Sequence, residues 1–177
     1  PDLLTDPEGR RVLTEVDLLA FAMVYLPHHI TDSTDKSMTF ADPHLDWVRL
    51  AQTWVRPIGG PRDWRHVFVA PRHTGKSTFW YLIIPLWAAA HGHARFIAAF
   101  ADSGAQAEMH LSTFKHELAT NALLRTDFPD LCRAAKRPSG ASEADNQNLY
   151  IAASGFVFAA KGIDAKNSGS GLLRSTS

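Results

Sequence analysis

The spacing of hydrophobic and polar positions predicts two helices in the first third of the chain. Residues 14–26 carry a broad apolar pattern that predicts a well-buried helix, with Thr14 as its N-cap and Pro27 as its end. A second helical pattern covers residues 44–54, and the polar, turn-rich stretch between the two is expected to be a surface connection. Prolines and glycines in 57–61 end this helical region.

After this break the pattern changes to strands that alternate with helices. A short, continuous apolar run in 65–70 predicts a central strand covered on both faces. A helix follows over 76–91, and Pro85 is expected to kink it or to end its regular part. A second strand is predicted at 95–101 and a further helix at 102–121. This order of elements predicts a parallel sheet with right-handed crossovers.

The last third of the chain predicts an antiparallel hairpin. Residues 128–148 are rich in Pro, Gly, Ser, Asn and charge, so we expect a long surface excursion there. Two strands, 149–153 and 156–160, follow with two residues between them, which is hairpin spacing. The predicted fold class is therefore α/β: a helical lead-in over 1–62, then a core over 63–177 with a mainly parallel sheet flanked by helices.

We expect the main ligand-binding site in a loop that begins at Ala70. Its last three positions have the spacing of a P-loop, whereas alanine stands where glycine is usual at the first. Gly75 lets the backbone approach a phosphate, Lys76 bridges the β and γ oxygens of a triphosphate, and Ser77 can place its hydroxyl on Mg²⁺. Because the loop follows a predicted strand and opens a predicted helix, we expect it to bind a nucleoside triphosphate. The expected phosphate-binding residues are Pro71, Arg72, His73, Thr74, Gly75, Lys76, Ser77 and Thr78.

Specific roles can be considered for two side chains inside the loop. Arg72 is either a charge stabiliser for the γ-phosphate, supplied in cis, or a solvent-facing loop arginine. His73 is interpreted as a loop filler rather than a base, because hydrolysis needs a positioned carboxylate and histidine offers no advantage there.

Composition narrows the class of protein. With 45% hydrophobic and 20% charged residues the chain has the balance of an ordinary globular domain. The formal net charge is zero, so any DNA contact must be local. Arg133, Lys136 and Arg137 form a basic cluster that is either a DNA phosphate contact or a solvated loop. The single cysteine, Cys132, indicates a reducing, cytoplasmic setting, and the apolar run 79–90 is shorter than the ~20 residues of a membrane span.

Histidines and tryptophans suggest two further kinds of site. No cysteine or carboxylate cluster stands at ligand spacing beside the two histidine pairs, so we predict surface histidines rather than a metal site. For the tryptophans, core packing is predicted over base stacking, because two of them lie seven residues apart on one apolar helix. The residues concerned are His28, His29, His91 and His93, and Trp47, Trp54, Trp64, Trp80 and Trp87.

In combination these features resemble the ATPase domain of the large terminase subunit of tailed bacteriophages. The loop 71–78 is similar to the variant P-loop of these motors, in which an arginine follows the residue after the strand and the first glycine is often missing. Segments 21–27 and 40–54 are similar to the family's helical lead-in, and 96–108 to its second strand and the polar helix start that follows. Segment 156–174 is similar to the antiparallel strands and Gly/Arg loop before the acidic Walker B strand. The order of these segments carries the resemblance.

The resemblance implies ATP hydrolysis coupled to DNA translocation, with Mg²⁺ as cofactor. The implied partners are double-stranded DNA, the portal protein and the small terminase subunit, with a homo-oligomeric ring on the portal, no membrane, and the cytoplasm of the bacterial host as the setting. Lys76 and Arg72 would be catalytic, with Arg72 sensing or stabilising the γ-phosphate, and the parent protein would also carry an endonuclease domain.

The sequence departs from the family's pattern in one respect. It holds no hydrophobic run that ends in paired acids, so we expect a fragment truncated before Walker B that binds nucleotide weakly and hydrolyses it poorly. The alternatives are another P-loop ATPase, such as a helicase-like protein, and a truncated nucleotide-binding protein without turnover.

Overall fold

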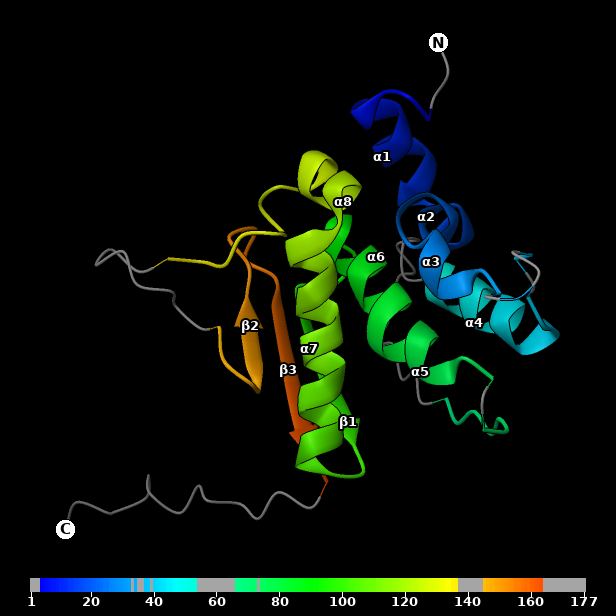
Figure 1. Cartoon of the computed structure of the whole chain (residues 1–177), viewed down its shortest axis with the longest axis vertical. Helices are drawn as coiled ribbons and strands as arrows, with labels where there is room; N and C mark the ends of the chain where they lie inside the picture. Colours follow the sequence, from blue (N-terminus) through cyan, green and yellow to red (C-terminus); the bar gives the residue numbers. More distant parts are fainter. Residues whose placement is uncertain are drawn as a thin grey trace.

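The chain folds as a mixed α/β structure in which a helical N-terminal region adjoins a small sheet (Figure 1). One hydrophobic cluster runs through both parts and includes Leu18 and Trp47 from the helices and Phe158 from the sheet. The coarse prediction of an α/β fold is therefore confirmed, whereas the sheet is mixed rather than mainly parallel over the described residues. The expected boundary at residues 62 and 63 lies outside the described residues. The structure is a computed structural model that describes residues 4–32, 34, 37–38, 40–53, 66–72, 74–136 and 145–163.

Short helices build the N-terminal region. The one predicted at 44–54 is confirmed as α4, although it begins two residues earlier and ends at Gln52. Its Trp47 is 2% exposed and belongs to the core, as predicted for the tryptophans, while Trp54 and Trp64 lie outside the described residues. The helices of this region are α1 (Pro7–Glu15), α2 (Leu18–Tyr25), α3 (Pro27–Ile30) and α4 (Asp42–Gln52).

The helix predicted at 14–26 has the wrong start. Asp17 caps α2, because its carboxylate accepts from the N–H groups of Leu19 and Ala20 at 2.9 and 3.0 Å. Thr14 is instead buried in the last turn of α1, where its hydroxyl donates to the carbonyl of Arg10 at 2.8 Å. The apolar pattern of α2 is therefore as predicted, but an aspartate three residues later provides the cap.

A buried ionic network ties α1 and α2 to α8 (Ala122–Asp127). Arg10 donates from Nε and Nη2 to the two carboxylate oxygens of Asp127, at 2.7 and 2.8 Å, and the Tyr25 hydroxyl donates to the same carboxylate at 2.7 Å. The side chain of Asp127 is fully buried. Burial opposes its ionisation, yet these hydrogen bonds hold the pKa of Asp127 below its ordinary value. The charged pair thus joins α1 to α8, and the Tyr25 hydroxyl joins α2 to the same carboxylate.

One continuous helix follows the predicted loop and confirms the prediction for 76–91. It consists of α5 (Lys76–Thr78), a π-helical turn η1 (Phe79–Ile83) and α6 (Ile84–Ala90). Pro85 does not end the regular helix as predicted, because α geometry begins again at Ile84 and continues through Pro85 to Ala90. In regular α geometry the proline ring would clash with the carbonyl four residues earlier, and the wide π-turn lies directly before it. The helix buries Trp87 completely, which confirms core packing for that residue.

In the part of the chain that the structure describes, the sheet contains three strands in the order β1-β3-β2. The strands are β1 (Phe96–Ala101), β2 (Leu149–Ile151) and β3 (Val157–Gly162). β1 runs parallel to β3 and β2 runs antiparallel to it, so the strand predicted at 95–101 and the predicted hairpin are both confirmed. Gly155 has a φ of +84° in the hairpin turn, a conformation that side chains with a Cβ atom rarely adopt.

The strand predicted at 65–70 is wrong over residues 66–70, the part of it that the structure describes. These residues carry no strand assignment, and Val67 and Val69 are 90% and 97% exposed. Phe68 is 41% exposed and stacks on Trp80, with 5.1 Å between ring centroids. An apolar run is buried on both faces only where neighbouring strands and covering layers meet it. Here β3, rather than this segment, is the parallel neighbour of β1.

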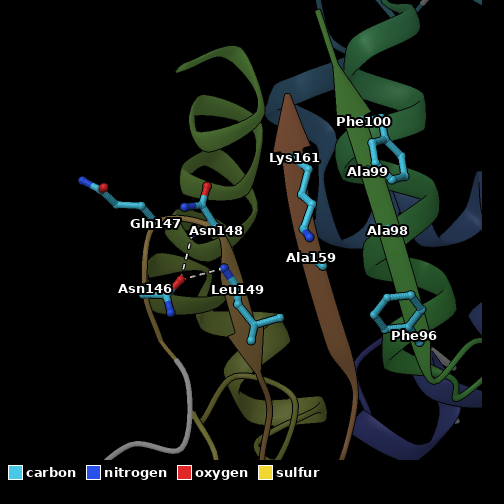
Figure 2. A pocket seen from close by; sticks show the side chains of 10 residues that line it. All are labelled: Phe96, Ala98, Ala99, Phe100, Asn146, Gln147, Asn148, Leu149, Ala159 and Lys161. Atoms are coloured by element: carbon cyan, nitrogen blue, oxygen red, sulfur yellow. Dashed lines mark hydrogen bonds between the residues drawn. The ribbon is translucent and has the colours of Figure 1, made fainter. Parts of the chain in front are cut away.

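The two faces of the sheet have different surroundings. The helix α7 (Gly104–Thr120), capped by Ser103, packs across the sheet and confirms the helix predicted at 102–121. Phe96 and Phe100 point to an open cavity of about 800 Å³, where they are 60% and 57% exposed (Figure 2). The residues that line this cavity come from the strands and from 146–148, and none comes from a helix. The predicted flanking of the sheet by helices is thus not met on this face within the described residues.

Candidate phosphate-binding site

The backbone turns sharply at Gly75, at the point where the predicted loop passes into the helix. Gly75 has a φ of +69°, in the left-handed region, and directly precedes the first residue of the helix. Its carbonyl accepts the N–H of Phe79 at 3.0 Å, so the loop passes into the helix without a gap. Ser77 and Thr78 lie in the first turn of that helix, while His73 lies outside the described residues.

Lys76 folds back over its own loop. Its Nζ atom donates to the carbonyl of Ala70 at 2.9 Å and to that of Pro71 at 3.4 Å. The Thr74 hydroxyl also donates to the Pro71 carbonyl, at 2.9 Å. The ammonium group therefore lies at the loop, against carbonyl oxygens that a phosphate can replace as its partner.

His44 braces the loop from the N-terminal region, a role that the sequence did not predict. Its Nε2 atom lies 2.6 Å from the carbonyl oxygen of Thr74, and its ring stacks on Phe79 with 4.8 Å between centroids and 11° between planes. The N–H of Ala41 donates to His44 Nδ1 at 3.2 Å. Because Nδ1 accepts this bond, Nε2 must carry the proton of the neutral ring and donate it to Thr74. The bond joins α4 to the loop across 30 residues.

A cavity of about 740 Å³ adjoins the loop. Lys76 and Ser77 line it from the start of the helix, and Asp102 and Gln106 line it from the carboxyl end of β1 and the start of α7. Asp102 is the only acidic residue among the described residues that line this cavity. In the sequence it appeared only as a helix start, although its place directly after a predicted strand was a usable signal.

Aromatic side chains form the apolar wall of the same cavity. His110 stacks on Tyr81 with 4.0 Å between ring centroids, and burial lowers the pKa of His110 below its ordinary value. Among the described residues, His110 Nε2 and Trp80 Nε1 are the buried side-chain nitrogen or oxygen atoms that have no hydrogen-bond partner. Trp80 packs at the edge of the core beside Phe68. The wall thus presents flat ring surfaces to the cavity, while these two nitrogen atoms are buried behind it.

Other predicted site residues do not join this arrangement. Arg72 is exposed on the loop, so its two interpretations both stand. Arg133 pairs with Asp130 at 2.6 Å, and Arg137 lies outside the described residues.

The pair His91 and His93 is used for structure. His91 Nε2 lies 3.1 Å from the Thr14 hydroxyl oxygen, and His93 Nε2 lies 2.8 Å from the carbonyl oxygen of Glu15. Burial lowers the pKa of His91 to about 4, with smaller contributions from His93 and Arg11. Its ring is thus neutral and packed near neutral pH.

Within the described part of the chain, no helix is long and apolar enough to cross a membrane. No protein family, curated protein or solved structure matches the chain.

Proposed function

We propose that this chain is a nucleotide-binding domain whose loop 71–78 binds the triphosphate of ATP. The observation that carries the proposal is the junction of loop and helix. Gly75 turns in the left-handed region, Lys76 begins the helix beside the loop carbonyls, and His44 holds Thr74 from outside. Backbone, cation and brace together are what a phosphate-binding loop needs.

Each group has a defined task in binding. The N–H groups at the start of the helix have no intrahelical acceptor, so they are free to donate to phosphate oxygens. Lys76 exchanges its two carbonyl partners for oxygens of the β- and γ-phosphates, and its flexible stem permits this movement. The positive end of the helix dipole favours the same negative charge.

The residues present fit a magnesium ion. Ser77 offers a hydroxyl and Asp102 a carboxylate in the same cavity, and Mg²⁺ prefers oxygen ligands of these kinds. When bound, the ion would neutralise charge on the β- and γ-oxygens. Arg72, which is exposed on the loop, would stabilise the charge of the γ-phosphate in its charge-stabilising role.

The biological role that we propose is the ATPase motor of a phage terminase large subunit, which drives viral DNA packaging. The support is the resemblance of the loop and of the order of segments around it, and the mixed α/β fold is compatible with it. The proposed partners are double-stranded DNA, the portal protein and the small terminase subunit, in the cytoplasm of a bacterial host.

One observation favours the second candidate, a nucleotide-binding protein without turnover. Catalysis by P-loop ATPases requires a residue that orients the attacking water in addition to the groups that hold the metal. Asp102 is the only acidic residue that lines the cavity among the described residues, so one carboxylate would have to serve both purposes. We therefore propose that this chain binds ATP and turns it over poorly.

A binding titration with a fluorescent ATP analogue and Mg²⁺ tests the proposal. Lys76→Ala should weaken binding at least about tenfold, which corresponds to ~1.4 kcal/mol. Lys161→Ala is the matched control, because Lys161 lies on the exposed face of the sheet and should have no effect. Equal affinities for wild type and both variants would refute phosphate binding by the loop. Robust Lys76-dependent hydrolysis by this 177-residue chain would refute poor turnover.

A further inference from the structure

Three potential metal ligands meet at a site away from the phosphate loop. His28 and His29 come from the short helix α3, and Glu117 comes from α7. One ligand atom from each of the three residues lies within 4.8 Å of the others. Glu117 is 88 residues from His29 in the sequence, so the spacing of residues gave no sign of a carboxylate beside the two histidines. The prediction of surface histidines was therefore made without knowledge of Glu117, the third potential ligand.

The two imidazole rings converge on one oxygen. His28 Nε2 lies 3.0 Å and His29 Nε2 lies 2.9 Å from Glu117 Oε1. Their ring centroids are 4.4 Å apart, so both rings already lie side by side with the same nitrogen facing the carboxylate. A metal ion placed among the three atoms requires small side-chain rotations rather than a backbone movement.

Glu117 is held by neighbours that orient its carboxylate. Its side chain is 6% exposed, and Asn121 Nδ2 donates to its other oxygen, Oε2, at 3.2 Å. The same amide nitrogen donates to the carbonyl of Tyr25 at 2.7 Å, which anchors it to α2. Such outer partners fix ligand orientation in metal sites, and here they leave Oε1 for the histidines.

The donor set favours a particular class of ion. Two imidazole nitrogens and one carboxylate oxygen suit Zn²⁺ and related divalent transition metals, whereas Mg²⁺ and Ca²⁺ prefer oxygen ligands throughout. Three protein ligands leave a fourth tetrahedral position open. His28 and Glu117 line an open cavity of about 490 Å³, and His28 is half exposed, so water or a small anion can reach that position.

We propose that His28, His29 and Glu117 bind one divalent transition-metal ion, Zn²⁺ foremost, which joins α3 to α7. In the metal-free form each Nε2 carries a proton and donates it to Glu117. When the ion binds, each neutral ring changes to the tautomer that has its proton on Nδ1, so that Nε2 can bind the ion. The site does not include the phosphate loop, so it does not depend on nucleotide binding.

Titration of the chelator-treated full chain with Zn²⁺, and the absorption spectrum of its Co²⁺ form, test this proposal. We expect one equivalent of Zn²⁺ per chain, a tetrahedral Co²⁺ spectrum, and a melting temperature that rises with free Zn²⁺. Glu117→Gln and His29→Gln should each weaken Zn²⁺ binding by about tenfold or more. His93→Ala, from the other histidine pair, is the matched control and should leave the affinity unchanged.

Each alternative outcome overturns the proposal. Absence of Zn²⁺ and Co²⁺ binding would mean that the three residues form a hydrogen-bonded cluster only. An equal loss in His93→Ala and His29→Gln would place the ion elsewhere. If the buried Glu117→Gln variant does not fold by circular dichroism, His28→Ala decides, because His28 is 52% exposed and its truncation leaves the core intact.

Discussion

Replacement of His44 with phenylalanine tests whether the N-terminal region positions the phosphate loop. Phenylalanine keeps a flat ring on Phe79 but removes the Nε2–H group that donates to the Thr74 carbonyl at 2.6 Å. A hydrogen bond of this kind has a net value of about 0.5–1.5 kcal/mol, and Thr74 is only partly buried, so water can replace the donor in part. We therefore expect a cost of about 1 kcal/mol in the population of the ordered loop.

This cost should appear in nucleotide affinity. A binding-competent loop that is less populated raises the apparent dissociation constant in proportion, and ~1 kcal/mol corresponds to about fivefold weaker binding. His44→Ala also removes the ring stacking, worth ~0.5–1.5 kcal/mol, and should weaken binding further. Anisotropy titrations with a fluorescent ATP analogue measure both effects, and urea unfolding shows whether each variant is folded.

His93→Phe provides the matched control for this experiment. His93 also faces a backbone carbonyl through Nε2, that of Glu15 at 2.8 Å, but it does not line the cavity beside the loop. The His93→Phe variant should bind nucleotide with the affinity of the wild type. If His44→Phe is folded and binds as tightly as His93→Phe, the brace does not position the loop and the reasoning is wrong.

Three predictions concern stability. Asp127→Ala leaves the Arg10 guanidinium buried without its partner and should lower the free energy of unfolding by about 3–5 kcal/mol. The control is Asp46→Ala, in an exposed ion pair, which should cost less than about 1 kcal/mol. Similar losses for the two variants in urea denaturation would contradict the buried network. The pKa of His91 is lowered from 6.5 to about 4, so the unfolded chain binds the extra proton between these values, and stability should fall by up to about 3 kcal/mol as the pH decreases from 6.5 to 4. Melting temperatures across this range should show the fall, and a His91→Leu variant that keeps the full fall would disprove its origin in this ring. Phe158→Ala, at a fully buried position, should lower the free energy of unfolding by about 3–5 kcal/mol, whereas Phe68→Ala should lower it by roughly half of that or less. Equal losses in urea denaturation would mean that Phe68 belongs to a buried strand after all.

Elements with strong local signals were predicted well. Ser103 caps α7 through its side chain, which accepts from the N–H of Gln106, and the apolar run of β1 follows a turn, so neither element needed distant information. The sequence contained a further signal that was missed. Asn121 ends α7 and also caps α8, with its side chain accepting the N–H of Leu124 at 3.2 Å, so a residue taken as a helix end also begins the next helix.

Features that depend on distant partners could not be predicted from spacing. The apolar run at 66–70 favours burial, but whether it forms a strand depends on which segment lies beside it. Here β1 pairs with β3. The loop residues of the candidate site followed from the motif, whereas the brace by His44 joins residues that are 30 apart. The meeting of Glu117 with His28 and His29 likewise exists only in the folded chain.

The π-turn between the loop and the core has a consequence for insertions and deletions. A π-turn holds about one residue more than an α-turn, so it shifts the phase of the helix before it by about 100° relative to the helix after it. Lys76 and Ser77 lie before the turn, and the buried Trp87 lies after it. A deletion of one residue within Phe79–Ile83 that restored a regular helix would leave α6 packed in the core and rotate Ser77 away from the cavity that it shares with Asp102. The direction in which the loop faces is therefore set by the number of residues in this turn as much as by the motif itself.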